Sequence, residues 1–267
     1  MYAAMRVFDL SLSEMLWSRR SVFMALVVGL PVLMALVVRV LAEAGLPALV
    51  DNNRAMSGPG IFGLMIWAFF VRLSIPVLGV FYGTSLIADE VEDKTITYLF
   101  SRPIPRGAVL LGKYFAFLVC TIFVVLPAVV LVWLLVIPIG GSLGANFIDL
   151  LVDLGLLALG LAVYGAVFAL AGAALKRPLL IGLVFALGWE PVAVLLPGYL
   201  KHFTVAFYLQ GLVPHAMPQN STLSLLQDLM REVPTLTESL FWLAVITAVC
   251  LWLAARAVTK REYVLEQ

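Results

Sequence analysis

The chain has 267 residues, of which 63% are hydrophobic and only 12% are charged, with a net charge of +1 and a mean hydropathy of +1.07. Soluble domains carry about 25% charged residues and about half apolar ones. A chain this apolar cannot cover its surface with polar groups, so a water-soluble globular protein is excluded and lipid is the expected solvent. No nucleic-acid partner is expected.

The segment before the first apolar run, residues 6–20, has the pattern of an amphipathic helix. Its apolar residues recur at helical spacing: Phe8, Leu12, Met15 and Leu16. Arg19 and Arg20 follow where a headgroup anchor would lie. We expect this helix in the cytosolic interface, and a frayed terminus is the alternative.

Six apolar runs are long enough to cross a bilayer, which takes about 20 residues because lipid cannot satisfy exposed backbone groups. The expected spans are residues 22–42, 61–88, 108–138, 150–175, 179–200 and 240–257. They predict an all-α integral membrane protein with one transmembrane domain over residues 1–267. The rival interpretation of the first run is a signal peptide cleaved near Ala42, but the region before the run is about twenty residues long and patterned, and the run contains Pro31.

The basic residues predict the orientation. Twelve of the 17 fall on one side: Arg6, Arg19, Arg20, Lys94, Arg102, Arg106, Lys113, Lys176, Arg177, Arg256, Lys260 and Arg261. Because Lys and Arg concentrate in cytosolic loops, we expect both termini and the loop between spans two and three to be cytosolic. The protein is then a multi-pass protein of the inner (cytoplasmic) membrane.

Motifs for catalysis are weak or missing. Residues 107–113 fit the first seven positions of a P-loop, but Tyr114 stands where a Ser or Thr must hold magnesium, and no strand is predicted before it. There is no H-E-x-x-H and no G-x-S-x-G motif. His202 and His215 are poorly spaced for a metal, and the two cysteines lie inside apolar runs. We therefore expect no enzyme, cofactor or metal site in this chain.

The loop between spans two and three is the richest cytosolic segment. Four acidic residues open it, which favours the start of a helix: Asp89, Glu90, Glu92 and Asp93. Ile96, Leu99 and Phe100 then form one apolar face, and Pro103 ends the helix. The pattern predicts a short helix at 90–101 that docks on a partner. An ordinary interfacial helix is the alternative.

This loop resembles the signature between spans two and three of type-2 ABC transporter permeases. The matching residues are Glu90, Thr95, Leu99, Ser101, Arg102, Pro103, Arg106, Gly112 and Lys113. Lys94 stands where that family usually has Gly, which is a change a helix tolerates. Trp189-Glu190 in span five and the long outer segment after it resemble one branch of the family.

The resemblance implies a permease subunit that pairs with a second copy or a paralogue and binds two separate ATPase subunits, which carry the ATP and Mg. Residues 90–101 would be the coupling helix. Its partner-binding residues would be Glu90, Lys94, Thr95, Ile96, Leu99, Phe100 and Arg102. Closing of the ATPase dimer would push this helix, move spans one, two and five, and export an unidentified substrate.

Two other functions stay open. In the first, the subunit has the same fold but transports no substrate. It would instead transmit the motion of the ATPases to an extracytoplasmic accessory protein docked on the 199–238 segment. Alternatively it would be an ATP-independent secondary transporter, although there is no internal repeat and no convincing ion relay. We expect the 199–238 segment to be re-entrant or interfacial.

Arg72 and Glu190 are the conspicuous charges inside expected spans. Such a charge costs about 2.5–3.5 kcal/mol at the bilayer centre, so intramembrane charges tend to be paired and functional. We expect the two residues to pair or to line a substrate path. For Arg72 the alternative is snorkelling to the outer headgroups. For Glu190 the alternative is a purely structural role, as the partner of Arg72, Arg39 or a nearby helix end.

Overall fold

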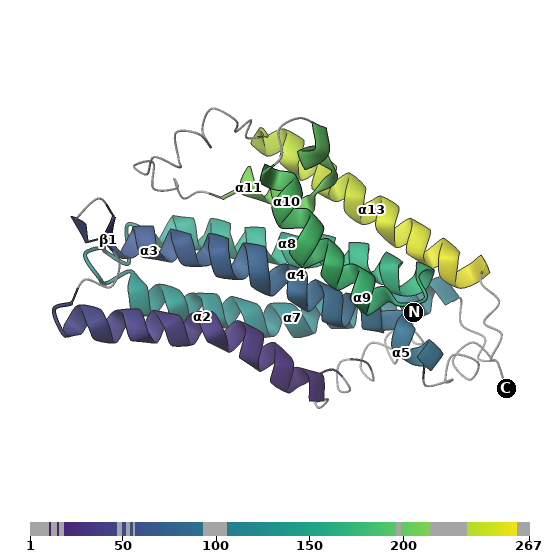
Figure 1. Cartoon of the computed structure of the whole chain (residues 1–267), viewed down its shortest axis with the longest axis horizontal. Coiled ribbons are helices and arrows are strands. Elements are labelled where there is room, and N and C mark those ends of the chain that lie inside the picture. Colours follow the sequence, from purple (N-terminus) through teal and green to yellow (C-terminus); the bar gives the residue numbers. More distant parts are fainter. Residues whose placement is uncertain are drawn as a thin grey trace.

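The computed structural model describes residues 11, 15, 19–46, 50–51, 54–55, 57–92, 106–195, 199–213 and 234–260. In this part of the chain the structure is almost entirely helical, and five helical stretches are long and apolar enough to cross a membrane (Figure 1). The exception is a small antiparallel hairpin of β1 (Val50–Asp51) and β2 (Arg54–Ala55). The prediction of an all-α integral membrane protein is confirmed.

The five long stretches contain the first, second, third, fourth and sixth expected spans. They are α2 (Arg19–Glu43); the consecutive α3 (Gly58–Met65), η1 (Ile66–Ser74), α4 (Ile75–Leu78), η2 (Gly79–Gly83) and α5 (Thr84–Glu92); α7 (Arg106–Val136); α8 (Phe147–Ala174); and α13 (Leu236–Lys260). Most predicted boundaries are within three residues of the observed ones. The two larger differences are at the end of the second span, where α5 continues four residues further, and at the start of the sixth, where α13 begins four residues earlier.

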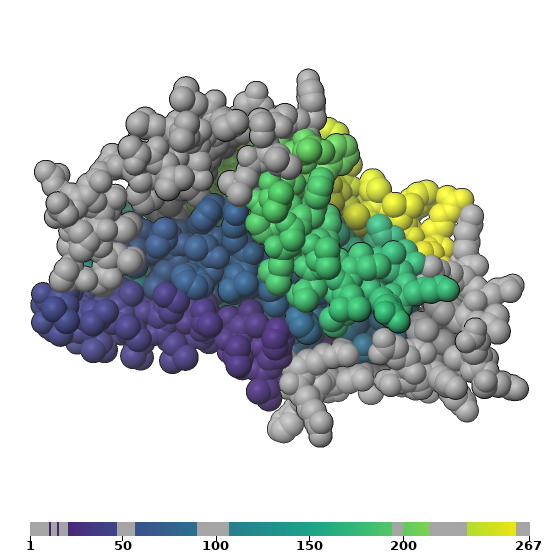
Figure 2. All heavy atoms as spheres, in the orientation of Figure 1, coloured from purple at the N-terminus to yellow at the C-terminus, as the bar shows by residue number. Residues whose placement is uncertain are grey.

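The fifth expected span, residues 179–200, is described as helix over residues 178–195. It consists of α9 (Pro178–Leu183), η3 (Val184–Trp189) and α10 (Glu190–Leu195). Its apolar part, Pro178–Ala193, is shorter than the five long helical stretches. The chain then forms η4 (Tyr199–Phe203) and α11 (Val205–Gln210). Figure 2 shows the α9–α10 region in green, between α2 in purple and α13 in yellow.

Consecutive helices run in opposite directions, so the connections alternate between two ends of the bundle. The last turns of α5, α8 and α13 and the first turn of α7 lie toward the right-hand end in Figure 1, and the first turn of α2 is the part of that helix nearest to it. We call this the inner end, because the basic residues predict that it faces the cytosol. The hairpin and the turn from α7 to α8 are at the other, outer end.

Helix α8 is the centre of the bundle and packs against α5, α7, α13 and η2. Small residues allow its closest contact. A Cβ atom on Gly172 would lie only 2.3 Å from the carbonyl oxygen of Thr84, so α5 and α8 touch backbone to backbone. Glycine at the crossing of two helices is typical of membrane proteins, where packing replaces the hydrophobic effect between helices.

The outward faces of α2, α7 and α13 carry large apolar side chains. Leu33, Phe123, Phe241 and Trp252 are each more than half exposed. In water such a surface would drive aggregation, whereas in a bilayer it meets acyl chains. These faces are therefore suited to contact lipid.

The expected N-terminal interfacial helix, residues 6–20, lies mostly outside the described residues. Ser11 is buried, and the Ser21 hydroxyl donates a hydrogen bond of 2.6 Å to the carbonyl of Met15. The amphipathic character of the whole segment stays a prediction.

Two of the membrane helices are widened by π-helical turns directly before a proline. The N–H of Ile75 bonds the carbonyl of Phe70, and the N–H of Glu190 bonds that of Phe185, each five residues back. Pro76 and Pro191 follow these residues in the sequence, and a proline ring clashes with the carbonyl four residues before it. A widened turn is one way for a helix to continue past this clash. Pro31 and Pro127 lie in α2 and α7 without π-helical turns.

Candidate functional site

The predicted coupling segment is described only at its start. Helix α5 continues the second span without a break to Glu92, so the backbone of Glu90 belongs to its last turns. The other six predicted partner-binding residues lie outside the described residues: Lys94, Thr95, Ile96, Leu99, Phe100 and Arg102. Their contacts stay a prediction.

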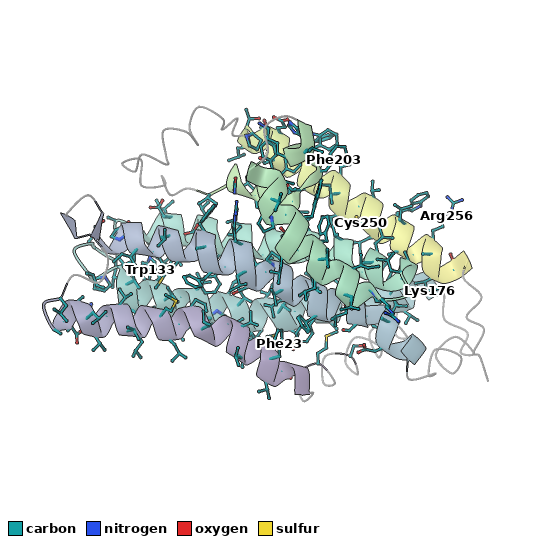
Figure 3. The ribbon with its side chains drawn as sticks, in the orientation of Figure 1. Phe23, Trp133, Lys176, Phe203, Cys250 and Arg256 are labelled. Atoms are coloured by element: carbon teal, nitrogen blue, oxygen red, sulfur yellow. The ribbon has the colours of Figure 1, made fainter. Side chains whose placement is uncertain are left out.

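The two helices that flank this segment are anchored at the inner end by a small apolar cluster. It contains Ile87 of α5, Leu110 of α7, Ala173 of α8, and Ala254 and Val258 of α13, all at most 1% exposed. Residues 93–105 connect α5 to α7, so both ends of the predicted coupling segment are fixed to α8 and α13. Figure 3 labels Lys176 and Arg256 near this end.

The strongest cluster of polar side chains inside the bundle surrounds Glu190. This residue opens α10 and is 3% exposed. Its Oε2 accepts a hydrogen bond from the hydroxyl of Tyr164 on α8, and its Oε1 accepts one of 3.1 Å from the N–H of Val205. Val205 is the first residue of α11, where the helix dipole favours a carboxylate. Glu190 thereby joins three elements: α8, α10 and α11.

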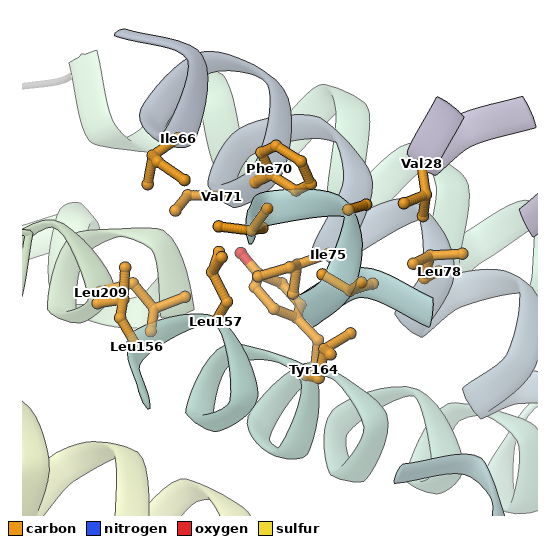
Figure 4. Close-up of a cluster of buried hydrophobic side chains, with 14 of the residues drawn as sticks. Val28, Ile66, Phe70, Val71, Ile75, Leu78, Leu156, Leu157, Tyr164 and Leu209 are labelled. Atoms are coloured by element: carbon orange, nitrogen blue, oxygen red, sulfur yellow. The ribbon is translucent and has the colours of Figure 1, made fainter. Parts of the chain in front are cut away.

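The environment of this carboxylate explains why its hydrogen bonds matter. Tyr164 is fully buried, and its hydroxyl points among the apolar side chains of Val71, Ile75 and Leu157 in Figure 4. Its ring stacks on Phe168 with the planes 12° apart. Removing a charge from water is costly unless the group is hydrogen-bonded, so each donor to Glu190 contributes to keeping this centre intact.

Arg72 belongs to the same polar centre. Its guanidinium carbon lies 4.6 Å from the centre of the Trp67 ring, a cation–π contact. The two residues are five apart, and the π-helical turns of η1 bring residues at this spacing to the same side of the helix. Arg72 also interacts electrostatically with both Tyr164 and Glu190. The two expected intramembrane charges are therefore near enough to influence each other electrostatically, while their role as a pair or in a substrate path stays a prediction.

Tyr164, Trp67 and Val205 are not among the site residues predicted from the sequence. Tyr164 lies in the middle of a long apolar run, where a phenol hydroxyl must find a partner, and that was a usable signal. The contribution of Val205 is a backbone N–H, which no sequence pattern marks. The placement of Trp67 beneath Arg72 depends on the π-helical turns.

The outer segment between the fifth and sixth expected spans is described for residues 199–213. Helix α11 is buried from Val205 to Leu209 and contacts α8, α10 and α13, so it packs into the bundle instead of lying on its surface. Tyr208 contacts Trp242 at the start of α13, with ring centres 6.4 Å apart. Phe203, labelled in Figure 3 at the outer end, is 75% exposed.

Comparison with known sequences gives one family. A sequence model described as "ABC-2 family transporter protein" matches residues 11–257, a stretch that includes every helix described above except the last residues of α13. It also includes the predicted coupling segment and the whole polar centre. No curated protein matches significantly.

Proposed function

Because the chain belongs to the ABC-2 family of transporter proteins, we propose that it is the membrane-spanning permease subunit of an ATP-driven exporter. The ATP and Mg would be bound by two separate ATPase subunits. A second copy of this chain or a paralogue would complete the membrane part. The observation that supports the proposal most directly is the family match over 11–257.

The location follows from the same proposal. The complex would lie in the inner membrane, with both termini and residues 90–101 on the cytosolic side, where the ATPases are. In support, the ends of α5, α7, α8 and α13 come together in the apolar cluster at the inner end, and several of the basic residues lie at these ends or just beyond them in the sequence. Lys and Arg concentrate on the cytosolic side of membrane proteins.

The inner-end cluster suggests how force would pass from the ATPases into the membrane. A push on residues 90–101 would reach α5 and α7 directly, since these helices flank the segment. Ile87 and Leu110 pack with Ala173 and Ala254, so α8 and α13 would move with them. A closely packed apolar contact transmits displacement because it has little free volume to absorb it.

Affinity co-purification in mild detergent tests the proposal. The native chain is compared with a variant carrying Leu99→Asp and Phe100→Asp, which places two charges on the predicted apolar face of the coupling helix. The matched control carries Tyr263→Asp and Val264→Asp, two equally disruptive changes in the C-terminal tail on the same predicted side.

We expect an ATPase of separate sequence to co-purify with the native chain and the control, and to be lost from the coupling variant. If the native chain purifies alone and still drives transport into ATP-free vesicles, it is a secondary transporter and the proposal is wrong. If the ATPase stays bound to the coupling variant, the predicted coupling residues are wrong.

A further inference from the structure

We propose that Arg72 is the binding point for the anionic group of an amphipathic molecule: a carboxylate, sulfate or phosphate attached to an apolar chain that reaches the site from the bilayer. The inference rests on the proposed function and adds the class of substrate. It follows from three features of the polar centre, namely which charge is accessible, how the guanidinium is held, and what surrounds it.

The accessible charge of this centre is the positive one. Arg72 and Trp67 are only half-buried, whereas Glu190 is 3% exposed and Tyr164 is fully buried. Arg72 is thus the charged residue of this centre that keeps exposed surface, although its Nε atom is itself buried. Because an arginine at membrane depth is costly to insert, its retention on an accessible face indicates a function.

The guanidinium is held in a geometry suited to an anion. Trp67 lies 4.6 Å beneath it, and stacking on a ring occupies the face of the guanidinium while its edges remain directed sideways. The group has five N–H donors, more than a single acceptor can use. A planar fork of donors matches the two oxygens of a carboxylate or phosphate.

The neighbouring carboxylate does not compete strongly for the same anion position. Its Oε2 holds the Tyr164 hydroxyl and its Oε1 holds the N–H of Val205, so both oxygens face α8 and α11. The opposite charges of Glu190 and Arg72 attract each other within this centre.

The surfaces of the helices that carry these two residues are apolar, which selects the rest of the ligand. Leu73 follows Arg72 and is 37% exposed, and Trp189 and Val192 are exposed beside Glu190. A small hydrophilic anion gains nothing from such a surface. An amphipathic anion buries its chain there, at about 0.8 kcal/mol for each CH₂ group.

The test is a binding titration of the full chain in nanodiscs of zwitterionic lipid, in which tryptophan fluorescence reports binding. The probe is a dodecanoate brominated next to its carboxylate, since bromine quenches nearby indoles. The comparison probe has the same brominated chain with a trimethylammonium group. The variants are Arg72→Gln, Arg72→Lys and Trp67→Phe, and the control is Arg39→Gln, which removes an exposed arginine that is ion-paired with Glu43 at 2.8 Å.

We expect saturable quenching by the carboxylate and none by the ammonium probe. Arg72→Gln should weaken binding about tenfold to a hundredfold, the range for losing a charge-assisted hydrogen bond. Arg72→Lys should keep part of the affinity, Trp67→Phe should remove the saturable quenching, and Arg39→Gln should change nothing. Displacement of the probe by phosphatidylglycerol would identify a bilayer lipid as the source of the anionic group, and persistence of binding would identify a single-chain molecule.

The proposal is overturned if the two probes quench native protein equally, if the ammonium probe binds instead, or if correctly folded Arg72→Gln binds the carboxylate as the native chain does. The probe comparison on native protein needs no variant, so poor folding of a mutant leaves the test valid. Since the titration contains no ATPase, a negative result contradicts the substrate class and leaves the co-purification result unaffected.

Discussion

At the level of single residues, the polar centre contains the most demanding chemistry in the described structure. A carboxylate, a phenol and a guanidinium lie together inside an otherwise apolar bundle. Glu190 is kept by donors from two neighbouring elements, Tyr164 of α8 and Val205 of α11. Loss of either donor leaves a buried negative charge with one hydrogen bond fewer.

Tyr164→Phe is therefore expected to destabilise the protein. The substitution removes the hydroxyl and nothing else, and an unsatisfied buried group costs about 1–3 kcal/mol. A lower midpoint of thermal unfolding in detergent, read from near-UV circular dichroism, would show the loss.

Tyr114→Phe is the matched control, because it removes a hydroxyl that donates 2.7 Å to the neutral carbonyl of Ala162. We expect a smaller loss there than at Tyr164. In combination with Glu190→Gln, Tyr164→Phe should cost less than it does alone. Strict additivity of the two changes would contradict a direct interaction between these side chains.

The sequence predicted this centre only in part. Charges are rare in membrane spans, so Arg72 and Glu190 are conspicuous in any reading of the chain. Their partners are not, since Tyr164 and Trp67 are two of many aromatic residues in apolar runs. Finding them requires the crossing geometry of α8, α10 and η1, which hydropathy does not contain.

At the level of helices, length and apolar character were predictable and internal irregularity was not. The long spans are recovered because about 20 apolar residues are needed to cross the bilayer. The fifth is described as helix only to Leu195, so the end predicted for it stays a prediction. Prolines signal a break in helical hydrogen bonding, yet only Pro76 and Pro191 follow widened turns.

The contact between α5 and α8 gives a sharp prediction at this level. Gly172→Ala would place a Cβ atom 2.3 Å from the carbonyl oxygen of Thr84, and neither backbone can move without separating the helices. We expect a loss of about 1–3 kcal/mol or more, as for other overpacked sites. Heating the detergent-solubilised protein and measuring by size-exclusion chromatography how much remains folded would determine this loss of stability.

Gly155→Ala on the same helix is the control. A Cβ atom there meets nothing within 4 Å, so the substitution should be neutral or raise stability by about 0.5–1 kcal/mol, the propensity advantage of alanine in a helix. Equal effects at the two positions would mean that α5 and α8 do not touch as described.

At the level of the whole molecule, the helices alternate in direction and divide the connections between two ends. The sequence predicted this arrangement from hydropathy and the position of basic residues alone. Hydropathy and the position of basic residues both reflect whether a segment faces lipid or water, and neither depends on how the helices pack. These two signals could not predict the burial of α11, because the position of this helix depends on contacts with α8, α10 and α13.

Cysteine labelling tests which end is cytosolic. Ser142 is exposed in the turn between α7 and α8, and Lys176 is exposed in the turn between α8 and α9, at opposite ends of α8. With Cys120 and Cys250 replaced by Ala, a membrane-impermeant maleimide should label Ser142→Cys from outside. It should label Lys176→Cys only after permeabilisation. The reverse pattern would invert the topology, and labelling of both from outside would contradict a spanning α8.

The π-helical turns also have a meaning for the ancestry of the chain. Such a turn contains one residue more than the α-helical turn it replaces, so it has the form of a single-residue insertion that the helix absorbed without breaking. Removing one residue would rotate everything beyond it by about 100° around the helix axis. In relatives that lack the extra residue before Pro191, the position that aligns with Glu190 would point away from Tyr164. An alignment gap of one residue at 184–189 would then mark which members of the family possess the polar centre.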